Sequence, residues 1–213
     1  MLKPLPRGRQ SMEEVLQKLI DYGSSDLDPH SGRMWAHSYE TGLEEVLEVA
    51  RRAYVMFMDK TMLNFTVYPS ILRMENEVVA MVASVMGGDE RTVGTFTYGG
   101  TESIILAVKA ARDHYRKAGK GMSVPEMVLP STAHPAFYKA AEFLGLKIVK
   151  VPVDQEAFKA VPDEVNEAVK DKTALIVGSA PNYPYGTVDP IRELGEIAPV
   201  SYTHLTLPTT ERV

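Results

Sequence analysis

Apolar residues in the first part of the chain recur at helical spacing. Ser11 and Glu14 stand at the spacing of a capping box, and the apolar face that follows predicts a helix that ends near Gly23. The same periodicity predicts a second helix over residues 40–59. These elements predict a helical N-terminal arm over residues 1–60.

From residue 61 onward, short apolar runs alternate with helical segments. A helix over residues 70–86, closed by the two glycines that follow it, precedes the first of these runs. Strands separated by helices at this spacing are typical of βαβ units with a parallel sheet. The pattern therefore predicts an α/β domain over residues 61–198. The expected strands are 93–97, 126–129, 147–151 and 173–178, and the expected helices are 101–117, 135–144, 162–169 and 191–198.

Composition narrows the class of protein without identifying it. Hydrophobic residues make up 45% and charged residues 24%, which is an ordinary globular balance. A net charge of −5 gives no reason to expect nucleic acid or an anionic membrane surface as a partner. The chain has no cysteine, no metal-site spacing, no signal-peptide core and no apolar run of the ~18–20 residues that span a bilayer. We therefore expect a cytoplasmic protein without a metal.

Three expected strand ends carry residues suited to ligand binding, which in α/β sheets occurs beyond the C-terminal ends of the strands. Gly99 and Gly100 allow a tight turn, and the amides of the helix that begins at Thr101 suit phosphate, although a simple capped turn explains the same residues. His134 can stack on a flat ring, move protons, or only cap a helix. Residues 179–186, stiffened by prolines and a glycine, read as a structural loop on spacing alone.

Together these segments resemble sphingosine-1-phosphate lyases and their bacterial relatives, within the group II decarboxylase superfamily of fold-type I pyridoxal 5′-phosphate enzymes. The resemblance covers most of residues 64–198, and the segments that carry it are 94–103, 107–113, 133–141 and 186–190. It implies an α/β fold, namely the N-terminal part of the aminotransferase-like large domain, truncated and preceded by a helical arm.

The resemblance also implies roles for individual residues. Gly100 and Thr101, with Gly99 shaping the turn, would hold the phosphate of pyridoxal 5′-phosphate. His134 would stack on its pyridine ring, and Ser179 would contact the side of the ring that carries the 3′-oxygen. The implied substrate-pocket residues are Asn64 and Tyr68, in a loop that reaches across the interface of a homodimer.

Two residues depart from the family pattern. Tyr98 stands where the family has a small serine, and would crowd or reshape the phosphate corner. Asn64 stands near the position of a histidine in the eukaryotic lyases, which puts sphingosine phosphate itself in doubt as the substrate.

The implied activity is that of a carbon–carbon lyase or an amino-acid decarboxylase that acts on an amine or amino-acid substrate through an external aldimine. The resemblance implies that the Schiff-base lysine and the pyridinium aspartate lie beyond the helix expected from residue 191. Lys109 and Lys139 stand on expected helices and are read as surface residues. Two alternatives remain open, an inactive fragment and an aminotransferase-like member of the same fold.

The end of the chain has an unusual composition. Residues 199–213 resemble the translation of a DNA sequencing adaptor, including the stop codon that would follow Val213. We therefore expect the native sequence to run to Ala198 and the last fifteen residues to be adaptor-derived.

Overall fold

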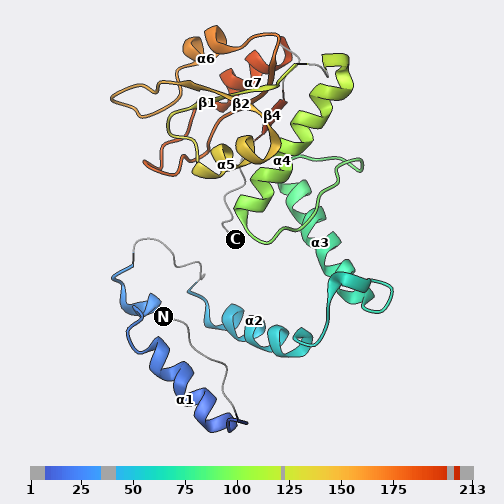
Figure 1. Ribbon diagram of the computed structural model, residues 1–213, viewed down its shortest axis with the longest axis vertical. Coiled ribbons are helices and arrows are strands. Elements are labelled where there is room, and N and C mark those ends of the chain that lie inside the picture. The colour runs from blue at the N-terminus through green and yellow to red at the C-terminus, as the bar shows by residue number, and fades with distance from the viewer. Residues whose placement is uncertain (1–7, 35–41, 121–122, 201–203, 207–213) are drawn as a thin grey trace. The chain divides into compact units, whose positions relative to one another are not determined.

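The computed structural model describes residues 8–34, 42–120, 123–200 and 204–206 (Figure 1). The chain divides between Asp59 and Lys60 into two compact units. The first unit contains α1 (Met12–Gly23), α2 (Glu44–Phe57) and a single 3-10 turn, Pro29–Ser31. The second contains every other helix and strand given below.

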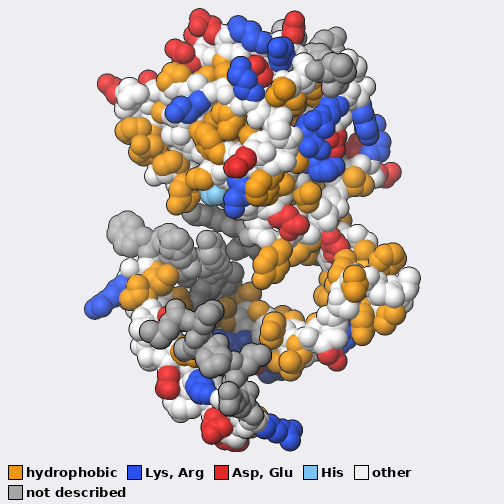
Figure 2. Space-filling model, viewed as in Figure 1, with side chains coloured by type: hydrophobic (Ala, Val, Ile, Leu, Met, Phe, Trp, Pro, Cys, Tyr) orange, Lys and Arg blue, Asp and Glu red, His pale blue; other side chains and the backbone are white. Residues whose placement is uncertain are grey.

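Helix α1 begins with the capping box that the sequence predicts. The Ser11 hydroxyl accepts the Glu14 amide at 3.1 Å, and the Glu14 carboxylate accepts the Ser11 amide at 2.9 Å. Both α1 and α2 are amphipathic, yet neither has a buried residue among those described. Apolar side chains such as Leu19 and Ile20 are therefore exposed within this unit. Figure 2 shows hydrophobic side chains at the surface of the described chain among charged ones.

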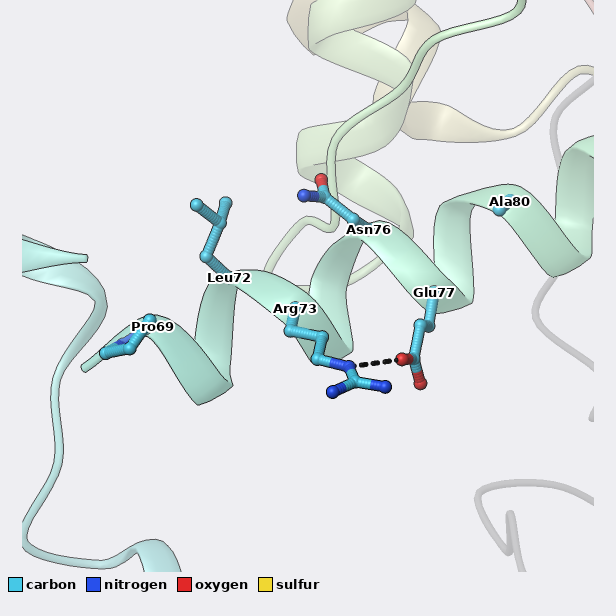
Figure 3. A pocket seen from close by; sticks show the side chains of 6 residues that line it. All are labelled: Pro69, Leu72, Arg73, Asn76, Glu77 and Ala80. Atoms are coloured by element: carbon cyan, nitrogen blue, oxygen red, sulfur yellow. Dashed lines mark hydrogen bonds and ion pairs between the residues drawn. The ribbon is translucent and has the colours of Figure 1, made fainter. Parts of the chain in front are cut away.

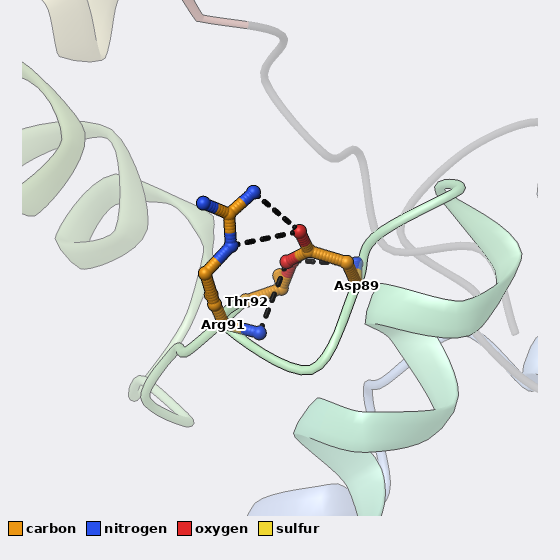
Figure 4. A network of polar contacts seen from close by, with 3 residues as sticks. All are labelled: Asp89, Arg91 and Thr92. Atoms are coloured by element: carbon orange, nitrogen blue, oxygen red, sulfur yellow. Dashed lines mark hydrogen bonds and ion pairs between the residues drawn. The ribbon is translucent and has the colours of Figure 1, made fainter.

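The second unit opens with a 3-10 turn, Met62–Asn64, and with α3 (Pro69–Val85). A polar turn follows α3, in which Asp89 accepts hydrogen bonds from the backbone amide and the guanidinium of Arg91 (Figure 4). These bonds hold the pKa of the Asp89 carboxyl below its usual range. The Thr92 hydroxyl accepts the Asp89 amide at 3.0 Å and completes the turn.

The strand expected at residues 93–97 is wrong, because this segment pairs with no other strand in the described chain. The hydrogen-bond donors of this segment bond to a helix and not to a neighbouring strand. Glu75 of α3 accepts the Phe96 amide at 2.9 Å and the Thr95 hydroxyl at 3.0 Å. Extended backbone satisfied in this way needs no neighbouring strand, so its alternating β-branched residues indicate extension but not pairing.

The four strands in the described part of the chain are parallel and lie in the order β2-β1-β3-β4. Helices α4 and α5 cover one face of the sheet, and α6 and α7 cover the other (Figure 1). The expected βαβ architecture is confirmed. The bounds are β1 (Glu126–Pro130), β2 (Lys147–Val151), β3 (Thr173–Val177), β4 (His204–Thr206), α4 (Gly100–Tyr115), α5 (Pro135–Leu144), α6 (Pro162–Ala168) and α7 (Ile191–Val200).

Alternate residues of the central strands supply two hydrophobic cores. Met127 and Leu175 pack on the side of α4 and α5, where Phe137 is fully buried. Val128 and Ile176 pack on the side of α6 and α7 with several other apolar residues. Burial on both faces explains why β1 and β3 read in the sequence as continuous apolar runs.

Helix α4 runs in the same direction as α5, which decides where its first turn lies. Arg112, near the end of α4, donates a hydrogen bond to the carbonyl of Leu144, the last residue of α5. Because α5 begins just after β1 and ends just before β2, the start of α4 lies at the C-terminal edge of the sheet. No helix in the described ranges is long and apolar enough to cross a membrane.

The last strand, β4, pairs with β3 through its backbone, in register with Leu175 to Val177. It lies within residues 199–213, whose origin from an adaptor stays a prediction. Backbone pairing of this kind does not depend on side-chain identity.

Candidate functional site

The turn before α4 is held in place by its own polar groups. Gly99 has a φ of +94°, a conformation that favours glycine. Glu102 accepts the Tyr98 amide at 2.7 Å, and the Thr97 hydroxyl bonds to the Gly99 carbonyl at 3.3 Å. The first turn of α4 is therefore shaped without a ligand.

This helix start leaves donors and space for an anion. The amides of Gly100 and Thr101 and the Thr101 hydroxyl bond to no other residue in the part of the chain that the structure describes. A Cβ added at Gly99 or Gly100 would meet no atom within 4 Å. Free amides at the positive end of a helix dipole bind phosphate groups. The turn therefore has the groups that an anion site needs, and its contact with the phosphate of a cofactor stays a prediction.

Tyr98 precedes the two glycines, where a tyrosine is expected to crowd the corner. It is 100% exposed and so packs against no described residue. Its backbone amide is the group that Glu102 binds. Its effect on a phosphate at this corner stays a prediction.

His134 lies at the same edge of the sheet, just after β1. It is the N-cap of α5, and its Nδ1 accepts the Ala136 amide at 3.1 Å. This bond orients the imidazole ring at the start of α5. The ring of Tyr183 meets His134 edge on, with centroids 5.2 Å apart and planes at 78°. A flat imidazole held in this way can stack on a pyridine ring.

Ser179 begins the loop that follows β3, the neighbour of β1. The residue is 3% exposed, and its amide donates to a carboxylate oxygen of Asp189 at 2.8 Å. Its hydroxyl has no hydrogen bond to any described residue. The contact between Tyr183 and His134 shows that the loops after β1 and β3 meet. The geometry thus brings His134 and the loop of Ser179 together.

Asn64 and Tyr68 lie elsewhere in the second unit. The Asn64 side chain accepts the amide and the hydroxyl of Thr66 at 3.2 and 2.6 Å, and Tyr68 is the N-cap of α3. Neither forms a hydrogen bond or a ring contact with the Gly99–Thr101 turn, His134 or Ser179 in the described structure. Their contribution to a substrate pocket stays a prediction.

Three residues of the site region have no role in the sequence-based prediction. Asp189 and Asn182 are 2% and 1% exposed and organise the loop after β3. Thr132 is 4% exposed, and its hydroxyl has no hydrogen-bond partner among the described residues. A buried polar group after β1 without a partner is unusual in a finished core. The only sequence signal for any of them is the Gly-Thr-Val-Asp-Pro run that ends in Asp189 and Pro190.

A separate hollow of about 390 Å³ lies on one side of α3 (Figure 3). All the residues that line it belong to this helix, and two of them, Arg73 and Glu77, form an ion pair at 2.8 Å. It contains none of the predicted site residues. No cluster of three or more metal-ligating side chains is present in the described ranges.

Known proteins share the sequence pattern and the fold of this chain. A family model described as aminotransferase class-V matches residues 70–206. Sphingosine-1-phosphate lyase of Arabidopsis thaliana is 39% identical over 193 residues, which are 87% of this chain and 35% of the relative. The solved sphingosine-1-phosphate lyase of Burkholderia pseudomallei matches with a TM-score of 0.88 and 33% identity, over 97% of this chain and 49% of its own.

The fold extends to more distant enzymes. Lactobacillus brevis glutamate decarboxylase matches with a TM-score of 0.80 at 19% identity, over 97% of this chain and 49% of its own. The chain spans about a third of the length of the curated relatives that it matches. The resemblance found in the sequence and the expected fold class are thereby confirmed. The chain belongs to the aminotransferase class-V family of pyridoxal 5′-phosphate-dependent proteins, and sphingosine-1-phosphate lyases are among its relatives.

Proposed function

We propose that the full-length protein is a pyridoxal 5′-phosphate-dependent lyase that breaks a carbon–carbon bond next to an amine. One observation carries the proposal: the free amides of Gly100 and Thr101 lie at the same sheet edge as His134 and Ser179. This set offers an anion site, a flat ring and a hydroxyl group, which are the partners that a phosphorylated pyridine needs. The similarity to lyases and decarboxylases supports the same reaction class.

Different residues of this chain would hold different parts of the cofactor. Gly100 and Thr101 would bind its phosphate through backbone amides and a hydroxyl, with Gly99 keeping the turn open. His134 would fix the plane of the ring, because its own orientation is set by the Ala136 amide. The Ser179 hydroxyl would contact the 3′-oxygen side. When bound, the cofactor supplies an electron sink for the electrons that the broken bond releases.

Pyridoxamine 5′-phosphate tests the binding step, since it has the same ring and phosphate but cannot form an imine with a lysine. We expect the 213-residue chain to bind it with quenching of its fluorescence, and to bind pyridoxamine, which lacks the phosphate, far more weakly. Equal binding of both compounds, or of neither, would contradict the site.

The reaction itself requires the full-length enzyme. We propose two possible outcomes of bond cleavage, decarboxylation of an amino acid or retro-aldol cleavage of a phosphorylated amino alcohol. Release of carbon dioxide from amino acids and release of a long-chain aldehyde from amino-alcohol phosphates separate them. Transfer of the amine to a keto acid, without either product, would instead indicate an aminotransferase.

We propose that the chain by itself binds the cofactor without covalent attachment. Lys109 is held by Asp113 at 2.7 Å on α4, in the half that leads away from the site, and Lys139 is exposed on α5. Each lysine lies at least one helical turn after the start of its helix. The helix starts are the parts that lie at the C-terminal edge of the sheet, so neither lysine is near that edge. Borohydride treatment with pyridoxal 5′-phosphate should leave no single lysine stoichiometrically labelled, and mass spectrometry of the digested chain checks this.

The full-length protein is further proposed to be a homodimer. The apolar faces of α1 and α2 support this, since side chains such as Leu16, Leu19 and Val49 are more than 45% exposed. Light scattering on the full-length protein gives the mass directly, and a monomer would contradict the proposal. A cytoplasmic location stays a prediction, which fractionation of cells that produce the protein would test.

A further inference from the structure

A small hairpin packs against the loop that follows β3. Val153 and Ala160 form an antiparallel bridge, and residues 154–158 make the turn between them. Asp154 accepts the amides of Glu156 and Ala157, which holds the pKa of its carboxyl below the usual range. We call residues 153–160 the hairpin and residues 179–189 the loop. The hairpin lies outside every sequence segment that resembles a cofactor-binding motif.

The tip of the hairpin is attached to the loop by three contacts at one residue. The Phe158 carbonyl accepts the Asn182 side-chain amide and the Thr187 hydroxyl, each at 3.0 Å. The Phe158 ring stacks on Tyr185, with centroids 4.3 Å apart and planes at 14°. Phe158 has a φ of 53°, an uncommon conformation for a residue with a bulky side chain. The hairpin thus adopts a strained shape at the point where it meets the loop.

The base of the hairpin is attached by one carboxylate. Asp189 accepts the Ala160 amide on one oxygen and the Ser179 amide on the other, each at 2.8 Å. Its own amide donates to the Ser179 carbonyl at 2.9 Å. The residue is 2% exposed and forms no salt bridge within the described structure. A buried carboxylate that has no cation beside it is stabilised by amide donors such as these. Asp189 therefore holds Ser179 and Ala160 in one arrangement.

We infer that Asp189 is a positioning residue of the cofactor site, because its carboxylate fixes Ser179 and the loop against the hairpin. The inference rests on the proposed function, since it concerns where Ser179 stands when the cofactor binds. The Ser179 hydroxyl has no hydrogen bond to any described residue, so its place is set by the Ser179 backbone, which bonds to Asp189. The loop also carries Tyr183 to His134, so the same hold extends to the ring contact.

The test compares Asp189→Asn with the unchanged 213-residue chain, with pyridoxamine 5′-phosphate as the probe. Asparagine keeps the size but turns an NH₂ group toward one of the two amides, leaving a buried donor unsatisfied. The unsatisfied donor loosens the hold on Ser179, so we expect probe binding about tenfold weaker or more. At saturating probe, its induced circular dichroism per bound molecule should also fall, which a loss of global stability alone does not produce.

Two further variants make the result decisive. Asp154→Asn is the matched control, because this carboxylate also binds two amides of the hairpin but does not touch the loop. We expect its probe binding to stay within twofold. Thr187→Val removes the bond to the hairpin tip, together with the bond that the Asn182 side-chain amide donates to the Thr187 hydroxyl, and should weaken binding severalfold. Far-ultraviolet circular dichroism shows whether Asp189→Asn folds. If it does not, the inference is tested on Thr187→Val, by its probe binding and by the hydrogen-exchange rate of its Ser179 amide.

Failure of the inference differs from failure of the proposed function. If the unchanged chain does not bind the probe, the cofactor site is wrong and the inference falls with it. If the unchanged chain binds but Asp189→Asn and Thr187→Val bind equally well, the inference alone is overturned. Equal weakening by Asp154→Asn would also overturn it. Faster hydrogen exchange at Ser179 in Asp189→Asn, with weaker binding, supports it.

Discussion

The ring of Tyr183 meets the ring of His134 edge on, at a centroid distance of 5.2 Å, although the two residues come from loops after different strands. His134 also accepts the Ala136 amide through Nδ1. The imidazole is therefore held from two sides, by the start of α5 and by the loop after β3. Its exposed surface is left for a ligand.

Removal of this ring contact should weaken cofactor binding. Edge-to-face pairs are worth about 0.5–1.5 kcal/mol, so Tyr183→Ala should lower the affinity for pyridoxamine 5′-phosphate by a few-fold, up to about tenfold. Tyr183→Phe keeps the ring and should bind like the unchanged chain. Fluorescence titration measures both, and a Tyr183→Phe variant as weak as Tyr183→Ala would show that the hydroxyl matters instead.

Gly100→Ala should weaken phosphate binding without unfolding the protein. The added Cβ meets no atom within 4 Å, so the fold accepts it, but it stands beside the amides that a phosphate would approach. We expect the affinity for pyridoxamine 5′-phosphate to fall about tenfold or more, which corresponds to the loss of one hydrogen bond to a charged group. The weak binding of pyridoxamine should not change. A large drop in the midpoint of thermal unfolding would contradict the conclusion that the space beside Gly100 is open.

Phe137→Ala should strongly destabilise the second unit. Phe137 is fully buried between α4, α5 and the sheet, and truncation of a buried phenylalanine costs about 3–5 kcal/mol. Phe143 lies on the same helix but is 65% exposed, so Phe143→Ala should change the free energy of unfolding by only about 0.5 kcal/mol. Urea denaturation of the two variants gives the comparison. Similar losses for both would mean that α5 does not pack as described.

Asp113 should make stability depend on pH in the acid range. Hydrogen bonds from Lys109 and then Arg112 lower the pKa of its carboxyl from 3.8 to about 2. A lowered folded pKa means that the contribution is present above the unfolded value and is lost as the pH falls from about 4 toward 2. Asp113→Asn cannot ionise, so the difference in thermal midpoint between the two proteins should shrink over this interval. Added salt should shrink it at neutral pH too, because the pair is near the surface.

Much of the architecture can be predicted from local sequence. Strands β1 and β3 are buried on both faces and therefore appear as short apolar runs, and α5 ends at Gly145, whose φ is +70°. The predicted strand at residues 93–97 is wrong because extended segments share a pattern whether or not they pair. A strand pairs only where a second strand lies beside it, and a local pattern does not show whether one does. Here the Glu75 carboxylate accepts the Phe96 amide in place of a neighbouring strand.

The residues of the candidate site also fall into two groups, those that a local sequence pattern predicts and those that it does not. The glycine turn at Gly99 and the helix cap at His134 depend on neighbours in the chain, so the sequence shows them. The hold on the loop after β3 joins residues far apart: Asp189 and Ala160 are 29 positions apart, and Asn182 and Phe158 are 24 positions apart. Such contacts exist only once the sheet has formed. Motif spacing therefore finds the residues that would touch the cofactor and misses the ones that place them.

The hold on the two ends of the 179–189 loop joins backbone groups to the carboxylate of Asp189, and the side chain of Val188 takes no part in it. The Ser179 amide and carbonyl and the Ala160 amide make the same bonds whatever stands at Val188, which is exposed. Substitutions at Val188 can therefore change the surface of the loop while Ser179 stays in place. The position next to the buried carboxylate is thus one where the sequence can vary without moving the residue that we expect beside the cofactor.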